Sequence, residues 1–141
     1  MQVNLGVKSA TYPNGEKLSD VYAYNHYGTE TIPPRPVLSI AVEKVVSTKE
    51  MKDHLAAYAH NMIIYALNSP GDLRKTEIDM LVAIGQQAVA EAKRIILAGT
   101  ELQENAPSTT RAKELKGSKG VGKPLYDSGL LIKNLGYEVT E

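Results

Sequence analysis

The sequence predicts one α+β domain spanning residues 1–141, with a small, mainly antiparallel sheet, about three helices packed on one face of it, and long extended loops. Three observations lead to this class. Strand-like stretches open the chain, helical periods occupy its middle, and a last strand-like stretch follows a long connection without any period. A chain of this length buries about two-thirds of its unfolded surface in one core.

The composition is that of an ordinary soluble globular protein, with 43% hydrophobic and 23% charged residues. Its 16 basic and 16 acidic residues cancel, so the overall charge does not indicate nucleic-acid binding. The chain has no cysteine, which excludes disulfides, thiol catalysis and thiolate metal sites. No run reaches the roughly 18 apolar residues of a membrane helix, and the N-terminus lacks a signal-peptide layout. We therefore expect a soluble protein made in a cytoplasm.

Strand and turn signals dominate the first 36 residues. Residues 3–7 alternate apolar and polar side chains, as a half-buried strand does. Residues 12–15 contain Pro followed by Asn-Gly and predict a turn. A second strand is expected over residues 20–27. Residues 32–36 carry three prolines and predict an extended, polyproline-like connector.

Helical signals follow. Residues 37–46 predict a short helix, and residues 47–50 match a capping box, a hydroxyl residue followed three positions later by Glu. The next helix is expected to end before Pro70-Gly71. One of its faces is predicted to pack inward, and it consists of Met51, Leu55, Tyr58, Ala59, Met62, Ile63 and Ala66.

The clearest helix covers residues 78–96. Small residues on its apolar face, Gly85 among them, predict that a neighbouring element approaches closely. Gly99 is expected to end this helix. The last strand is predicted over residues 130–139, with an irregularity at Gly136.

A long polar connection joins the last predicted helix to the last predicted strand. Residues 105–129 show no sustained period, and structureless connections longer than about 12–15 residues are uncommon in compact domains. The stretch is rich in Lys, Gly and Ser, and it is clearly basic from Arg111 to Lys123. We predict a basic arm whose backbone groups find partners in neighbouring molecules.

Three patterns suggest chemistry, and each has a simpler explanation. Residues 117–123 fit the spacing of a phosphate-binding loop, but Pro124 stands where magnesium requires Ser or Thr. Residues 127–129, Asp-Ser-Gly, are similar to the aspartic-protease signature, but the two long helices contradict that fold, and a turn in which Asp127 accepts backbone amides explains them. His54 and His60 lie about 240° apart around a helix and cannot share an ion. We expect no catalytic residue, cofactor or metal site.

Two segments carry a resemblance. The first reads AYNHYGT at residues 23–29 and IPPRPVL at 32–38; the second reads NAPST at 105–109 and KPLYDSGL at 123–130, before the last strand. Together they resemble the small tail-completion or neck proteins of tailed bacteriophages, the virion-morphogenesis proteins. That family has aromatic-Gly-Thr, Ile-Pro-x-Arg-Pro-aromatic-Leu, Asn-x-Pro-Ser-Thr and Lys-Pro-Leu-x-Asp-Thr-Gly-x-Leu in the same order. His26, Val37 and Ser128 depart from its pattern.

The resemblance implies a structural protein of a virion neck, forming a homo-oligomeric ring at the head–tail connection or completing the tail. Its partners would be other copies of itself and adjacent neck, portal-side or tail-tube proteins. Genomic DNA would pass through the ring without specific binding. The protein would be present in the host cytoplasm during assembly and in the virion afterwards. Subunit or partner contacts are expected at Tyr27, Ile32, Arg35, Pro36, Pro107, Arg111, Lys116, Lys123, Leu125 and Asp127.

Other interpretations stay open. Arg35 has a rigid fork suited to a carboxylate on a neighbour, but an internal contact of Arg35 or Asp127 is an equal alternative. The basic residues 111–123 also fit a small nucleic-acid-binding module without sequence preference. A hydrolase centred on Asp127 is a further hypothesis.

Overall fold

The computed structural model describes residues 1–68 and 73–141. In this part of the chain the elements are β1 (Gln2–Val7), α1 (Leu18–Tyr27), α2 (Val37–Ser47), α3 (Lys49–Asn68), α4 (Leu73–Ala98), α5 (Pro107–Leu115), α6 (Leu130–Asn134) and β2 (Leu135–Thr140). The expected fold, a small sheet with about three helices on one face, is therefore wrong. The described residues form six helices around a sheet of only two strands.

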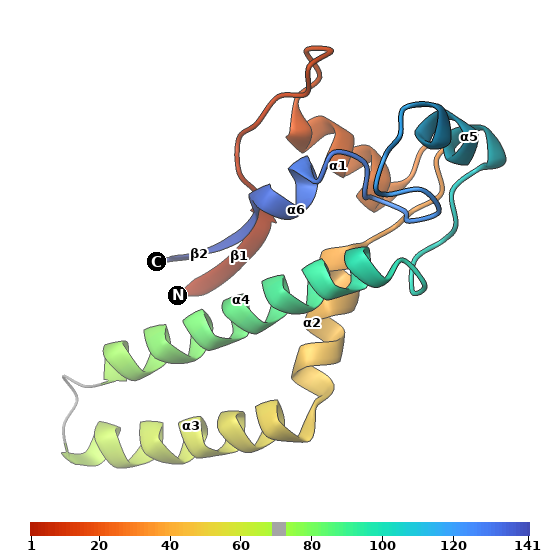
Figure 1. Ribbon diagram of the computed structural model, residues 1–141. Coiled ribbons are helices and arrows are strands. Elements are labelled where there is room, and N and C mark those ends of the chain that lie inside the picture. The colour runs from red at the N-terminus through yellow and green to blue at the C-terminus, as the bar shows by residue number, and fades with distance from the viewer. Residues whose placement is uncertain (69–72) are drawn as a thin grey trace.

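The sheet joins the two ends of the chain. β1 and β2 pair antiparallel, from Gln2 opposite Thr140 to Val7 opposite Leu135, and Figure 1 shows the termini side by side. The predicted first strand is confirmed. The last strand begins at Leu135 because residues 130–134 form α6, and Gly136 pairs regularly with Gly6, without the expected irregularity.

The strand predicted at residues 20–27 is wrong, because this segment is the helix α1. Its aromatic and branched residues favour a strand, but the helical spacing places Leu18 in the core with Val21 and Tyr22 beside it. Two contacts one turn apart also suit a helix. Tyr22 Oη lies 3.1 Å from His26 Nδ1, and Asn25 Nδ2 donates to the Val21 carbonyl at 2.8 Å. Tertiary packing thus overrides local propensity.

The core lies where α4 crosses α2 and the sheet (Figure 1). The bounds of α2 were predicted closely, whereas α4 begins at Leu73, five residues before the predicted start at residue 78. It ends before Gly99, whose φ of +74° is the left-handed conformation expected of a helix stop. The buried cluster draws on most elements of the chain: Leu18, Val37, Leu38, Ala41, Val89, Ala92, Ile95, Ile96, Leu102, Leu131 and Leu135.

Gly85 allows α4 and β2 to approach closely. A Cβ at this position would lie 2.4 Å from Cδ2 and 2.6 Å from Cγ of the Tyr137 ring. Gly85→Ala is expected to lower the unfolding free energy by about 1–3 kcal/mol, since overpacking outweighs the gain in helix propensity of about 1 kcal/mol. Urea unfolding measures this. Gly6→Ala is the control, because nothing lies within 4 Å of its Cβ, and equal losses in both variants would contradict the prediction.

The helix cap between α2 and α3 is shifted by one residue from the expected one. Thr48 Oγ1 accepts a hydrogen bond from the Met51 amide at 3.2 Å, whereas Ser47 Oγ donates back to the Glu43 carbonyl at 2.6 Å. Figure 1 shows α3 and α4 side by side, with α4 lying along the sheet and α3 on the side of α4 away from the sheet. Pro70 and Gly71, before which the sequence predicts the end of α3, lie outside the described residues. No helix in the described part of the chain is long and apolar enough to cross a membrane.

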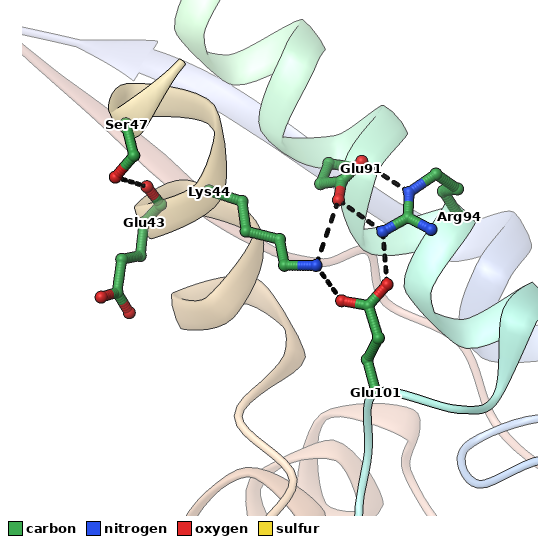
Figure 2. A network of polar contacts seen from close by, with 6 residues as sticks. All are labelled: Glu43, Lys44, Ser47, Glu91, Arg94 and Glu101. Atoms are coloured by element: carbon green, nitrogen blue, oxygen red, sulfur yellow. Dashed lines mark hydrogen bonds and ion pairs between the residues drawn. The ribbon is translucent and has the colours of Figure 1, made fainter.

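Figure 2 shows a network of ion pairs that joins α2, α4 and the segment after α4. Arg94 donates from Nε and Nη2 to the Glu91 carboxylate at 2.8 and 2.7 Å, and from Nη2 to Glu101 at 2.5 Å. Lys44 of α2 pairs with Glu101 and lies 3.9 Å from Glu91. These hydrogen bonds lower the pKa of the Glu91 and Glu101 carboxyl groups.

The network makes stability depend on pH in acid. Because both carboxyl pKa values are lower in the folded state, their stabilisation is present above the unfolded value near 4.5 and is lost as the pH falls through the folded values. We expect Glu101→Gln to reduce the slope of stability against pH in that range, with little effect at pH 7 because the group is exposed. Urea midpoints from pH 7 to 3 measure the slope. An unchanged slope would contradict the prediction.

Candidate functional site

The two segments of the resemblance lie together in the fold. A cleft of about 620 Å³ is bordered by the turn at residues 12–16, by α1, by the connector at 31–35, by α5 and by residues 125–131. Figure 1 shows α5 and the loop after it beside the end of α1. Segments separated by about half of the chain thus form one site.

The expected structureless arm at residues 105–129 contains a helix and is folded. α5 starts with Pro107 at its first position, where the missing amide hydrogen costs nothing, and the Thr109 and Thr110 amides donate to the Ala106 carbonyl. The residues Ser108 to Thr110 are weak helix formers, so no helical period signals α5. Residues 117–123 are turns between α5 and α6, and Pro124 is buried.

Arg35 ties the first segment to the second from inside the protein. Only 6% of its surface is exposed. Its Nε donates to the Gln103 carbonyl at 2.7 Å, its Nη2 to the Glu104 carbonyl at 2.8 Å, and its Nη1 to Asn25 Oδ1 at 3.3 Å. Burial lowers the pKa of the guanidinium. Of the two alternatives for Arg35, the structure has the internal contact.

Replacing Arg35 by Lys tests whether this fork is needed. A lysine keeps the charge but cannot reach two neighbouring carbonyls and an amide oxygen with fixed, planar donors. We expect Arg35→Lys to lower the unfolding free energy by about 2–3 kcal/mol. Arg111→Lys, at an exposed position of α5, is the matched control and should change it by less than about 0.5 kcal/mol. Equal urea midpoints for the two variants would refute a role for the fork.

Lys113 stabilises the second segment through hydrogen bonds within that segment. Its side chain is buried, with 8% of the residue exposed. The ammonium donates to the carbonyls of Tyr126 at 2.7 Å, Lys123 at 2.8 Å and Gly120 at 3.3 Å. Burial lowers the pKa of this ammonium. In the sequence Lys113 is one more cation of a basic run, so nothing there distinguishes it from a solvated lysine.

Further contacts hold the loop that surrounds Lys113. Ser118 Oγ donates to the Asp127 carbonyl at 3.2 Å and accepts from the Gly120 amide at 3.1 Å. Leu125 has a φ of +62°, the left-handed region that leucine rarely adopts. The turn that follows is held by Ser128, whose Oγ accepts from the Leu130 amide at 3.3 Å; this is the role expected of Asp127. The loop therefore keeps one shape through its own polar groups.

The cleft collects half of the predicted contact residues. Its lining includes Ile32, Arg35, Lys116, Leu125 and Asp127. Of these five residues, Lys116 and Asp127 are exposed to solvent. The other half lie elsewhere. Tyr27 is exposed at the end of α1, Pro36 precedes α2, Pro107 and Arg111 are exposed on α5, and Lys123 packs against Gly99.

Sequence reasoning did not single out Lys113, Asn25 or Asn105 as members of the site. Asn105 lines the cleft, and its Nδ2 is the single buried side-chain nitrogen or oxygen without a hydrogen-bond partner in the described part of the chain. An unpaired buried donor costs about 1–3 kcal/mol. Of the polar residues that line the cleft, Lys116 and Asp127 are among those exposed to solvent.

No known protein family matches this chain by its family model, and no curated protein or solved structure matches it either.

Proposed function

We propose that the protein is a structural component of a tailed-phage virion, which forms an oligomeric ring in the neck, at the head–tail connection or at the completed end of the tail. One observation carries the proposal. The two segments that resemble the neck proteins meet at one cleft, where Arg35 of the first donates to Gln103 and Glu104 just before the second, 68 and 69 residues away.

The chemistry of these contacts favours a scaffold. Arg35 and Lys113 donate most of their hydrogen bonds to main-chain carbonyls. These hydrogen bonds hold the loops in shape. A loop that is ordered before it meets a partner loses less conformational entropy on docking. The exposed residues on the same segments, among them Pro107, Lys116 and Asp127, would contact adjacent copies or the neighbouring neck, portal-side or tail-tube proteins in the virion.

Inactivating the gene in the genome that encodes the protein tests the proposal. We expect electron microscopy of the lysate to show DNA-filled heads and separate tails, and the wild-type gene supplied in trans to restore joined particles. The empty complementation vector is the control and should leave heads and tails separate. Infectious, normally joined particles without the gene would refute the proposal. Portal and major tail genes beside this gene would add support.

The alternative, a nucleic-acid-binding module, is supported by Arg111, Lys116 and Lys119, which are exposed around α5. It is weakened by Lys113, because this cation of the basic run is buried and donates to carbonyls. Binding of duplex DNA by the purified protein at several salt concentrations separates the two. A steep fall in affinity with salt, by the counterions released from several phosphates, would favour the alternative.

A further inference from the structure

The helix α3 lacks the charges that a solvent-exposed helix normally carries. The 15 residues 54–68 contain no Asp, Glu, Lys or Arg, in a chain with 23% charged residues. The charged residues that flank this stretch in the sequence are Asp53 and Asp72. Depletion of charge is typical of the buried centre of a protein–protein interface.

This uncharged helix is packed on one side only. Met51 is its single buried residue among those described, and the partly buried Leu55, Tyr58, Met62 and Tyr65 follow at helical spacing toward α4. Ile63 and Ala66, predicted to pack inward, are exposed instead. Figure 1 shows α3 at the edge of the molecule with α4 on one side of it.

The solvent side of α3 carries an apolar stripe. Ala56, Ala59, Ile63 and Leu67 are spaced by three and four residues and therefore share one face, which we call the outer face. The exposed fraction is 64% for Ile63 and 78% for Leu67. Such a stripe has the pattern of anchors with which a helix enters an apolar groove.

The same chain contains an apolar groove. It has a volume of about 810 Å³ and lies between β1, α1 and α2, where it is lined by Leu5, Tyr22, Tyr27, Leu38, Val42 and Val46. We call it the α1–α2 groove. Tyr27, which is exposed, lines this groove. It does not line the cleft, where half of the predicted contact residues lie. Because the groove is mainly apolar, a helix with charged anchors would bury unpaired charges there.

We propose that the outer face of α3 seats in the α1–α2 groove of a second copy of this chain. This inference rests on the proposed ring, because a closed ring needs two different, complementary surfaces on each subunit. The outer face of α3 and the α1–α2 groove are two such surfaces. Both surfaces are apolar. Glu43 also lines the groove, and residues 54–68 of the helix have no carboxylate that would repel it.

One contact between α3 and the groove buries little area, so the stability of the assembly depends on closing the ring. A 15-residue helix is about 22 Å long and 10–12 Å wide, so half of its circumference offers roughly 350–400 Å². A stable interface buries about 800 Å² on each partner. One seat is thus half of the standard size, whereas a subunit in a closed ring makes two contacts, one through α3 and one through the groove. We therefore expect weak pairs and stable rings.

Cysteine cross-linking tests this seat, and the cysteine-free sequence makes it unambiguous. Ile63→Cys and Ala59→Cys place a thiol on the outer face, and Ser39→Cys, an almost isosteric change, places one in the groove. With a short bismaleimide, the double variants should give a ladder of dimers, trimers and larger products. Each single variant should stay monomeric, and a mixture of two complementary singles should stop at the dimer.

The cross-linking test has one control and two outcomes that would overturn the proposal. Leu97→Cys with Ser39→Cys should give no ladder, because Leu97 is exposed on α4 and lines neither the groove nor the cleft. Cross-linking of the Ile63→Cys single variant to itself would indicate a two-fold α3–α3 pair and overturn the seat. Absence of a ladder in the double variants would overturn it as well.

A second measurement does not depend on cysteine geometry. Ile63→Glu with Leu67→Glu should abolish self-association in sedimentation experiments while unfolding as the wild type does, because both side chains are mostly exposed. Leu97→Glu, on α4 and outside both surfaces, is the control. Rings that persist in the double variant would refute the seat and leave the proposed function standing. A cross-linked ladder together with joined particles from the gene-inactivated genome would refute the function and leave the seat standing.

Discussion

Lys113→Met is expected to lower the unfolding free energy by about 3–5 kcal/mol, one of the two largest effects that we predict. The lysine ammonium can donate three hydrogen bonds, and its Nζ lies within hydrogen-bond distance of three carbonyls of the loop, those of Gly120, Lys123 and Tyr126. Methionine has a similar length but no donor. The variant would leave three main-chain carbonyls without this partner in a mostly dry environment, and each loss costs about 1–3 kcal/mol.

Urea unfolding of Lys113→Met against Lys116→Met measures the effect. Lys116 carries the same charge three residues later and is exposed, so its variant should differ from the wild type by less than about 0.5 kcal/mol. Amide hydrogen exchange should also show faster exchange at the Gly120, Lys123 and Tyr126 amides in Lys113→Met alone. A Lys113→Met protein as stable as the control would show that the ammonium does not hold the loop.

Gly120→Ala is expected to lower the unfolding free energy by about 3 kcal/mol or more, through steric conflict. A Cβ at Gly120 would lie 1.8 Å from the Tyr126 carbonyl oxygen and 2.5 Å from its carbon. These are backbone atoms, so the conflict is relieved only when the loop moves, and this same carbonyl accepts the shortest bond of Lys113. The substitution therefore also breaks the site around Lys113.

Gly122→Ala is the control for this variant. Gly122 has a φ of +75° but nothing within 4 Å of its Cβ, so an alanine there meets only backbone strain of about 1–2 kcal/mol. Thermal and urea unfolding should rank Gly120→Ala well below Gly122→Ala. If the two were equally stable, the close approach of Gly120 to Tyr126 would be absent in solution.

The sequence by itself determined the elements whose pattern agrees with their final packing. Residues 3–7 alternate because one side of β1 faces the core, and the apolar face of α4 with Gly85 predicts a close neighbour, which is Tyr137. The stop at Gly99 follows from the conformational freedom of glycine. These features depend on local periodicity and backbone preference, which a single sequence contains.

Only the tertiary structure decided the segments with weak or contrary local signals. Residues 18–27 have the composition of a strand, but Leu18 is fully buried in the core, and the spacing of its neighbours requires a helix there. Residues 107–115 show no apolar period because α5 buries the stem and ammonium of Lys113 instead of a hydrophobic face. Likewise, the exposure of Ile63 depends on how far α3 extends beside α4.

The same contrast holds for the site. The two motif segments can be found in the sequence, and half of the predicted contact residues line one cleft. The burial of Arg35 and Lys113 cannot be found there, because a cation next to polar residues normally stays in water. Their charges become internal when main-chain carbonyls converge on them, from a distant segment for Arg35 and from the loop after α5 for Lys113. That convergence is a property of the folded chain, since hydrogen-bond partners 10–69 residues away have no signature in local sequence.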